Sequence, residues 1–200
     1  GSVYLIGSGI YDITGPAGEI VMMGFAVSEQ KTAGIHLRLR SRAFVIGDDT
    51  KRVVFVSADL GQLFQMVKVK VCEKIAAKAE LAKFYNTKNV LISATHTHNG
   101  PGGYSGYFLY DVTVNGFVKQ NFNAIVDGIY RSILRAHNNV KPGRIYVNEG
   151  TIDGCGGNRA VEAYNNNPAR ERAASETSSR NGVNGTGTQP ARTACRRIAI

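Results

Sequence analysis

The feature that most limits how this 200-residue chain can fold is an alternation of short apolar runs with two long amphipathic segments. The short runs have the length and the Val/Ile content of strands, whereas the long segments repeat apolar residues at helical spacing. The predicted elements are strands at 34–46 and 52–57, a helix at about 60–83, a strand at 90–92, a helix at about 117–137 and a strand at 144–148. Helices of this length can connect parallel strands as right-handed crossovers. The sequence therefore predicts an α/β fold in which strands alternate with amphipathic helices in a layered sheet.

Glycines mark two predicted turns. Residues 47–49, Gly-Asp-Asp, lie between the first two of these strands and indicate a hairpin. Gly7-Ser8-Gly9 lies between two short apolar pieces near the start of the chain. A turn between strands is favoured there over a phosphate loop, because the third glycine and the following helix of such a loop are missing.

Two histidines stand where the strand at 90–92 ends. His96 and His98 follow that apolar run and precede a Gly-Pro-Gly-Gly turn at 100–103. Residues two apart in an extended backbone project to the same side, so the two imidazoles would converge on one point. Zinc binds neutral imidazole nitrogens at about 2.0–2.1 Å. The pair indicates either part of a zinc site or two hydrogen-bonded loop histidines, since two ligands alone do not make a zinc site.

Other polar residues have simpler explanations. Asp59 follows the strand at 52–57 and could cap the next helix, support a metal-bound histidine or contact a substrate, and the cap is the simplest of these. His36 lies on the polar face of a strand and is interpreted as a surface residue. His137 ends the second helix, where a cation is favoured by the helix dipole.

Four aromatic residues follow the histidines within seven positions. They are Tyr104, Tyr107, Phe108 and Tyr110. Such a segment beside a metal loop could wall a tunnel for an alkyl chain, or it could belong to the core.

The residues around the histidines closely resemble a family motif. The neutral ceramidases, zinc-dependent amidases that cut ceramide into sphingosine and a fatty acid, carry a motif similar to residues 94–103, Ala-Thr-His-Thr-His-Asn-Gly-Pro-Gly-Gly. Further blocks that resemble this family, in its order, are residues 7–16, 22–25, 29–36, 59–61, 122–129 and 158–159. The resemblance covers about Tyr4 to Pro168.

The resemblance implies roles for four residues. His96 matches the family's zinc ligand and His98 an active-site residue near the metal, two roles that the spacing of the pair does not separate. Gly24 matches a glycine whose backbone comes close to the substrate, and Arg159 matches an arginine that holds the polar head of the substrate. The implied reaction is hydrolysis of ceramide, in which Zn²⁺ acts as a Lewis acid and a serine from a later segment attacks or assists.

The same resemblance predicts the domain organisation. Residues 3–168 are expected to be the N-terminal portion of a ceramidase-like catalytic domain. Family members are several times longer and take their serine and their remaining zinc ligands from later segments, so the 200 residues alone are expected to be inactive. No Gly-Asp-Val-Ser motif occurs in the sequence, and no nucleophile is assigned. Residues 169–200 lack apolar periodicity and family blocks and are expected to form a disordered tail.

Composition and charge fit this interpretation. Hydrophobic residues make up 43% of the chain and charged residues 20%, which is typical of a globular protein. The net charge of +9 is unevenly placed, with +4 in residues 169–200 and +5 over the first 168, and the mildly basic body indicates no nucleic-acid partner. Peripheral contact with a membrane surface suits a lipid substrate, and the resemblance implies a secreted or membrane-associated protein. The sequence itself shows no signal peptide and no apolar run near the roughly 20 residues that span a membrane.

Two alternatives remain open. Other metal-dependent amidohydrolases also place a His-x-His pair at a strand end, but they need a (β/α)₈ barrel with later ligands, for which this chain is too short. The chain could instead be a truncated, inactive product that binds lipid without cutting it or is unstable. A sheet deprived of later strands is expected to leave an exposed edge and an uncovered face.

Overall fold

The computed structural model describes residues 3–152, 160–172 and 193–199. It divides into two compact units, Gly1–Arg144 and Ile145–Ile200. The first unit contains a mixed sheet with helices, as the sequence predicts, and it carries both histidines of the motif.

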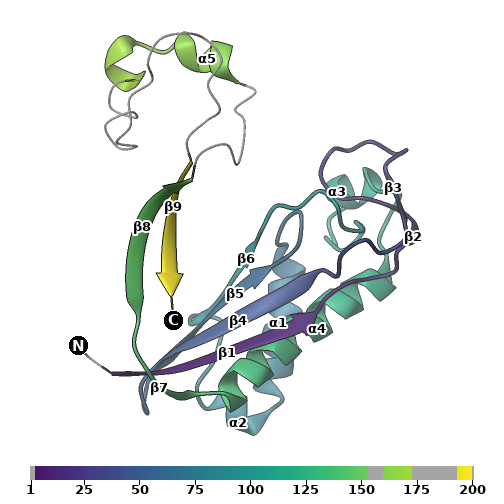
Figure 1. The fold of residues 1–200 in the computed structure, drawn as a ribbon. Helices are drawn as coiled ribbons and strands as arrows, with labels where there is room; N and C mark the ends of the chain where they lie inside the picture. Colours follow the sequence, from purple (N-terminus) through teal and green to yellow (C-terminus); the bar gives the residue numbers. More distant parts are fainter. Residues whose placement is uncertain (1–2, 153–159, 173–192, 200) are drawn as a thin grey trace. The chain divides into compact units, whose positions relative to one another are not determined.

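The first unit is built on a five-stranded sheet with the strand order β6-β5-β4-β1-β7 (Figure 1). Its strands are β1 (Tyr4–Asp12), β4 (Arg40–Gly47), β5 (Arg52–Ala58), β6 (Val90–Ala94) and β7 (Lys141–Gly143). The predicted hairpin joins β4 to β5, and the Asp48 carboxylate stabilises its turn by accepting hydrogen bonds from the Thr50 and Lys51 amides. A separate two-stranded sheet pairs β2 (Gly18–Val21) with β3 (Lys31–Ala33).

Helices cover one face of the five-stranded sheet (Figure 1). The helices of this unit are α1 (Gln65–Ala76), α2 (Ala79–Ala82), α3 (Phe108–Val112) and α4 (Lys119–Asn138). Val45 and Val56 of the sheet and Ile129 and Ile133 of α4 are fully buried in the core between the layers. The predicted helix at 60–83 is in fact two helices, and the first begins only at Gln65.

The topology is less parallel than the sequence predicted. Only β5 and β6 run parallel, connected through α1 and α2, and every other neighbouring pair in the sheet is antiparallel. The prediction of parallel strands was wrong for the second helix, because α4 returns the chain to the opposite edge, where β7 pairs antiparallel with β1. The strand expected at 144–148 is confirmed from Tyr146 on, as β8 (Tyr146–Ile152), but β8 belongs to the second unit and the last strand of the five-stranded sheet is β7.

The second unit pairs β8 antiparallel with β9 (Thr193–Ala199), and Val147 is opposite Ile198. A short helix, α5 (Val161–Asn165), lies between them in the sequence. The structure thus gives regular structure to residues 193–199, which the sequence assigned to a disordered tail. Residues 173–192 of that tail lie outside the described residues.

Gly7 and Gly9 are not a turn but the middle of β1, where α4 comes closest to the sheet. A Cβ on Gly7 would lie 2.0 Å from the Ala136 carbonyl oxygen, and a Cβ on Gly9 would lie 2.3 Å from that of Ser132. The predicted turn was therefore wrong. The two glycines have a packing role that short flanking apolar pieces could not reveal, because it depends on a helix more than a hundred residues later.

Gly9→Ala should destabilise the first unit, because the added methyl group meets helix backbone that cannot rotate away. We expect a loss of about 1–3 kcal/mol in the free energy of unfolding, measured by urea denaturation. Gly18→Ala is the matched control, since a Cβ there meets nothing within 4 Å. A change of less than about 0.5 kcal/mol in both variants would contradict the close approach of α4 to β1.

His137, in the last turn of α4, packs against aromatic rings. Its Nδ1 is 3.1 Å from the hydroxyl of the buried Tyr85, and the rings of Phe84 and Tyr85 lie 5.7 and 5.6 Å from the imidazole. Burial and the charge of Arg52 lower the pKa of His137, with partial opposition from Glu80. This environment favours the neutral imidazole and not the capping cation that the sequence predicted.

Stability should therefore fall in mild acid through His137. Because folding lowers the pKa of this group, its contribution to stability is fully present above the unfolded value of about 6.5 and is lost as the pH falls from there toward the folded pKa. We expect the urea midpoint of the wild type to fall between about pH 8 and about pH 5.5, and His137→Gln to reduce this fall. His36→Gln, at an exposed position, is the control, and equal pH dependence in all three proteins would contradict the assignment.

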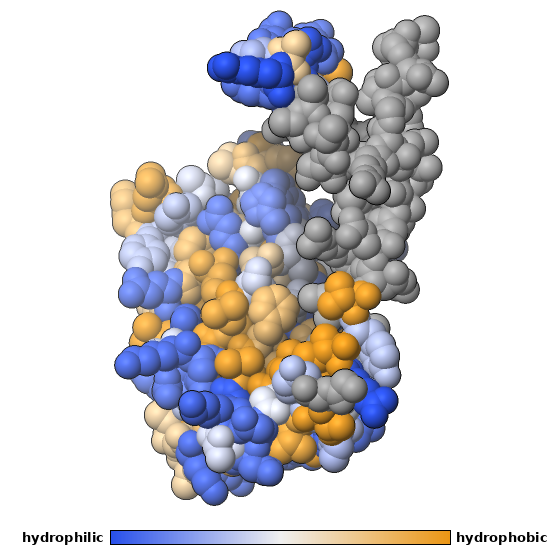
Figure 2. Space-filling model, turned by 90° about the vertical axis from the view of Figure 1, so that its left-hand side faces the viewer, coloured by the Kyte–Doolittle hydropathy of each residue, from blue (hydrophilic) through white to orange (hydrophobic). Residues whose placement is uncertain are grey.

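The sheet face away from the helices carries exposed apolar side chains. Phe55 and Leu91 are neighbours across β5 and β6 and are 41% and 60% exposed, and the partly buried Phe44 lies beside Phe55 on β4. Figure 2 shows apolar side chains gathered in one region of the surface, bordered by polar ones. Apolar patches of this kind mark surfaces that other protein segments or ligands cover. Taken by itself, the first unit thus leaves apolar side chains of this sheet face exposed.

Candidate functional site

Parallel pairing of β5 with β6 brings two loops together at one edge of the sheet. The register pairs Ala58 with Ala94, so residues 59–61 and 95–98 leave the sheet side by side. The Thr95 amide donates to the Ala58 carbonyl at 2.9 Å, and the Thr97 amide donates to the Leu60 carbonyl at 3.2 Å. Carboxyl ends of neighbouring parallel strands are a common place for functional groups in α/β proteins.

His96 and His98 converge at this edge, as the sequence predicted. Their Nε2 atoms are 3.2 Å apart, and their ring centroids are 4.7 Å apart. The predicted reason was wrong, because β6 ends at Ala94 and His96 has a left-handed backbone with φ of 63°. Left-handed backbone in a residue other than glycine is uncommon and costs about 1–2 kcal/mol, and such strain is concentrated at functional sites.

A backbone carbonyl fixes the protonation of the His96 ring. Nδ1 of His96 lies 2.7 Å from the Gly61 carbonyl oxygen, and a carbonyl can only accept, so Nδ1 carries the proton. Nε2 of the neutral His96 ring is then unprotonated and accepts a hydrogen bond from Nε2–H of His98 at 3.2 Å. Histidines that bind metals usually have the second nitrogen held in this way.

Gly24 lies against the ring of His98. A Cβ on Gly24 would be 2.5 Å from Cγ of His98, and the backbone of Gly24 has φ of +138°. Phe25 packs edge-on against the same imidazole, with 4.3 Å between the ring centroids. Hydrogen bonds from the Met23 amide to the Gly100 carbonyl and from the Gly102 amide to the Val21 carbonyl hold this loop beside the histidines. The structure thus brings three of the four predicted site residues together.

Asp59 does not cap a helix. Its carboxylate accepts hydrogen bonds from the Arg40 amide at 2.9 Å and from the Arg42 guanidinium at 2.8 Å, and the helix that follows begins six residues later at Gln65. The prediction that Asp59 caps a helix was therefore wrong, because both carboxylate oxygens accept hydrogen bonds from residues at the start of β4. Nor does it support His96, whose ring is held by Gly61.

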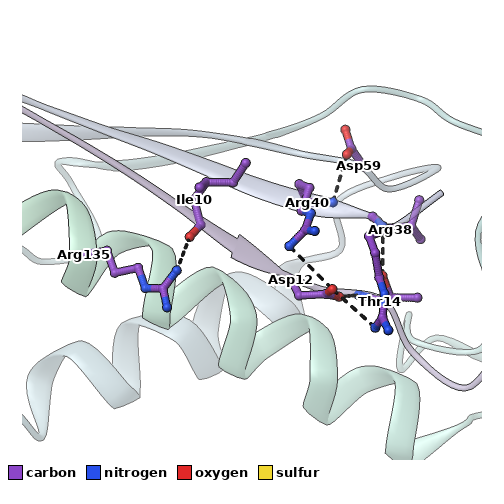
Figure 3. A network of polar contacts seen from close by, with 8 residues as sticks. Ile10, Asp12, Thr14, Arg38, Arg40, Asp59 and Arg135 are labelled. Atoms are coloured by element: carbon purple, nitrogen blue, oxygen red, sulfur yellow. Dashed lines mark hydrogen bonds and ion pairs between the residues drawn. The ribbon is translucent and has the colours of Figure 1, made fainter.

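A second acid, Asp12, joins this polar network at the end of β1 (Figure 3). It accepts a hydrogen bond from the Thr14 amide at 2.7 Å and pairs with Arg38 and Arg40 at 3.5 and 3.6 Å. Burial alone would raise the pKa of Asp12, but the bonds from Thr14 and the two arginine charges outweigh it and lower the pKa. Asp12 and Asp59 together fix the ends of β1, β4 and β5 beneath the histidine loop.

The aromatic segment after the histidines divides between core and surface. Tyr104 is 1% exposed, whereas Phe108 is 84% exposed and Tyr107 and Tyr110 are about half exposed. The core interpretation is therefore confirmed for Tyr104, and the tunnel interpretation of the three exposed residues stays a prediction. Beside Tyr104 a small cavity with room for about one water molecule lies behind the loop, which is too small for a lipid chain.

The donor set fits half of a zinc site. Two ligands bound to tetrahedral zinc at about 2.05 Å are about 3.3 Å apart, close to the 3.2 Å between the two Nε2 atoms. Residues 3–152, 160–172 and 193–199 bring no three His, Cys, Asp or Glu side chains together in a metal-binding group. Among these residues His96 and His98 are thus the candidate ligands, and a closed site needs others.

Arg159 lies outside the described residues, so its predicted role stays a prediction. Sequence reasoning missed the Gly61 carbonyl, the ring of Phe25 and the buried Asn121, whose side-chain amide donates to the Pro101 and Gly102 carbonyls at 2.8 Å. Phe25 and Gly61 lie within the family blocks at 22–25 and 59–61, and Asn121 directly precedes the block at 122–129. The Gly61 role is carried by backbone and leaves no side-chain signal, whereas Phe25 and Asn121 act on partners that are distant in sequence.

Comparison with known proteins decides the family. The family model described as "Neutral/alkaline non-lysosomal ceramidase, N-terminal" matches residues 4–183, which extends past Pro168. The chain belongs to the neutral ceramidase family. The neutral ceramidase of Oryza sativa subsp. japonica is 53% identical over 173 residues, covering 86% of this chain and 22% of that protein. The neutral ceramidase of Pseudomonas aeruginosa is 47% identical over 167 residues, covering 82% and 25%.

Solved structures agree with this membership. A ceramidase complexed with C2 matches with a TM-score of 0.77 and 46% identity, over 83% of this chain and 26% of that one. The crystal structure of the neutral ceramidase from Pseudomonas aeruginosa also matches with a TM-score of 0.77, over 82% and 26%. The chain therefore has the ceramidase fold over its N-terminal part and spans about a quarter of the length of these relatives.

Gly24→Ala should displace the ring of His98. Gly34→Ala is a matched control, because Gly34 has φ of +144° but a Cβ there meets nothing within 4 Å. Both variants pay a similar backbone penalty, so a difference between them reports the contact with His98. We expect the His98 ring resonances, and their contacts with Phe25 in NMR spectra, to change in Gly24→Ala alone. Equal spectra of His98 in both variants would contradict the contact.

Proposed function

We propose that this chain forms part of a zinc-dependent ceramidase that hydrolyses ceramide to sphingosine and a fatty acid. The observation that supports it most is the convergence of the Nε2 atoms of His96 and His98 at 3.2 Å, on a loop of a family whose relatives are named ceramidases. The relatives are about four times longer, so the activity belongs to a site that this chain would share with further residues.

His96 and His98 would divide the work at this site. His96 would hold zinc through Nε2, because its Nδ1 proton is engaged by Gly61. Bound zinc supplies a Lewis acid for the amide carbonyl of the substrate. His98 would position the substrate and stabilise developing charge at Nε2, within a ring confined by Gly24 and Phe25. Arg159 would hold the polar head of the substrate.

A lipid substrate implies contact with a membrane surface from outside the bilayer. Within the described part of the chain, no helix has the length and apolarity to cross a membrane. Peripheral attachment, in a secreted or membrane-associated protein, is consistent with this finding and stays part of the proposal.

Activity is best tested in a chain of full family length. Residues 4–168 would replace the matching segment of the Pseudomonas aeruginosa neutral ceramidase, which is 47% identical. We expect this chimaera to release fatty acid from labelled ceramide, to lose that activity with a chelator and to regain it with zinc.

The variant His96→Ala in the chimaera should lower kcat/KM by at least about a hundredfold, because one zinc ligand is lost. His36→Ala, which removes an exposed histidine, should leave it unchanged. A chimaera that folds and binds zinc but does not cut ceramide would contradict the proposed substrate. A folded chimaera that binds lipid without zinc would favour a non-enzymatic lipid-binding role.

A further inference from the structure

The loop that carries Gly61 is held by a residue of the aromatic segment. The Tyr104 hydroxyl donates to the Gln62 carbonyl at 3.1 Å and accepts from the Gln62 amide at 3.3 Å. One side chain thus satisfies both backbone groups of the residue next to Gly61. The side chain of Gln62 itself is exposed, so Tyr104 holds the backbone only.

Tyr104 is suited to this task because it is rigid. It is 1% exposed, and its ring packs edge-on against Phe64 with 5.3 Å between the centroids. Burial raises the pKa of Tyr104 to about 12, because it outweighs the hydrogen bonds with the Gln62 and Gly61 backbone, which lower the pKa. The hydroxyl therefore keeps its proton and remains a donor. Gly61 itself is buried and closely packed, since a Cβ there would lie 2.8 Å from Cγ of Met23.

We propose that the Tyr104 hydroxyl is a positioning group for His96: by fixing Gln62, it keeps the Gly61 carbonyl on Nδ1 and leaves Nε2 unprotonated toward His98. The functional meaning of this inference rests on the proposed function, because a metal ion binds an unprotonated Nε2. Its structural content, the tautomer of His96, can be measured without metal.

Tyr104→Phe removes only the hydroxyl, and Tyr107→Phe is the matched control. Tyr107 belongs to the same segment and donates to the exposed Gln65 side chain at 2.9 Å, with no connection to Gln62. In the metal-free 200-residue chain, long-range ¹⁵N NMR should show His96 with its proton on Nδ1 in the wild type and in Tyr107→Phe. In Tyr104→Phe we expect a measurable Nε2–H form and exchange of the Nδ1 proton about tenfold faster.

Zinc affinity, measured in the chimaera of full family length, gives a second readout. Loss of an outer partner of a ligating histidine typically weakens metal binding about 10–100-fold, and Tyr104 acts one step further out, so we expect the Kd of Tyr104→Phe to rise about three- to tenfold. Gln62→Ala should bind zinc like the wild type, because the bonds to Tyr104 come from the backbone.

The two readouts separate this inference from the proposed function. A changed tautomer without zinc binding in any variant would support the positioning role and contradict the metal site. An Nε2–H tautomer in the wild type, or identical tautomers and exchange rates in Tyr104→Phe and Tyr107→Phe, would overturn the positioning role. If Tyr104→Phe does not fold, hydrogen exchange in the wild type tests the positioning role instead. The Gln62 amide proton and the His96 Nδ1 proton should then exchange through the same local opening of the loop, so their exchange rates should depend on urea concentration in the same way. Exchange of the two protons with different urea dependence would overturn the positioning role.

Discussion

The parallel pairing of β5 with β6 is the constraint on which the candidate site depends. It places the loop after Ala58 and the loop after Ala94 at the same edge of the sheet, although more than thirty residues separate them in sequence. Without that register the Gly61 carbonyl could not reach His96, and the tautomer of the ring would not be fixed. The sheet therefore does more than support the loops, because it determines which nitrogen of His96 is available.

Much of this arrangement follows from sequence because it is carried by side chains. The apolar runs, the β4–β5 hairpin and the convergence of His96 and His98 could be predicted, as could the place of Gly24 through its family block. The roles of residues whose partners are distant in sequence could not be predicted. Gly9 is explained only by α4, and Asp59 only by the arginines of β4.

Backbone groups explain most of what the sequence leaves undetermined at the site. The Gly61 carbonyl orients His96, Asn121 holds the carbonyl groups of the following turn, and Tyr104 holds Gln62. None of these contacts appears as a pattern of residue types. Together they indicate a histidine loop that is fixed in place before any ligand binds, which reduces the cost of forming a metal site.

X-ray absorption at the zinc edge would test the central claim most directly, because it reports the atoms bound to the metal. With one equivalent of Zn²⁺, the chimaera of full family length should show imidazole nitrogen scattering at about 2.0–2.1 Å, part of it from His96. The same spectrum in His96→Ala should show fewer imidazole contributions. Oxygen scattering alone in the unsubstituted chimaera, or a spectrum unchanged in His96→Ala, would contradict a metal site at His96.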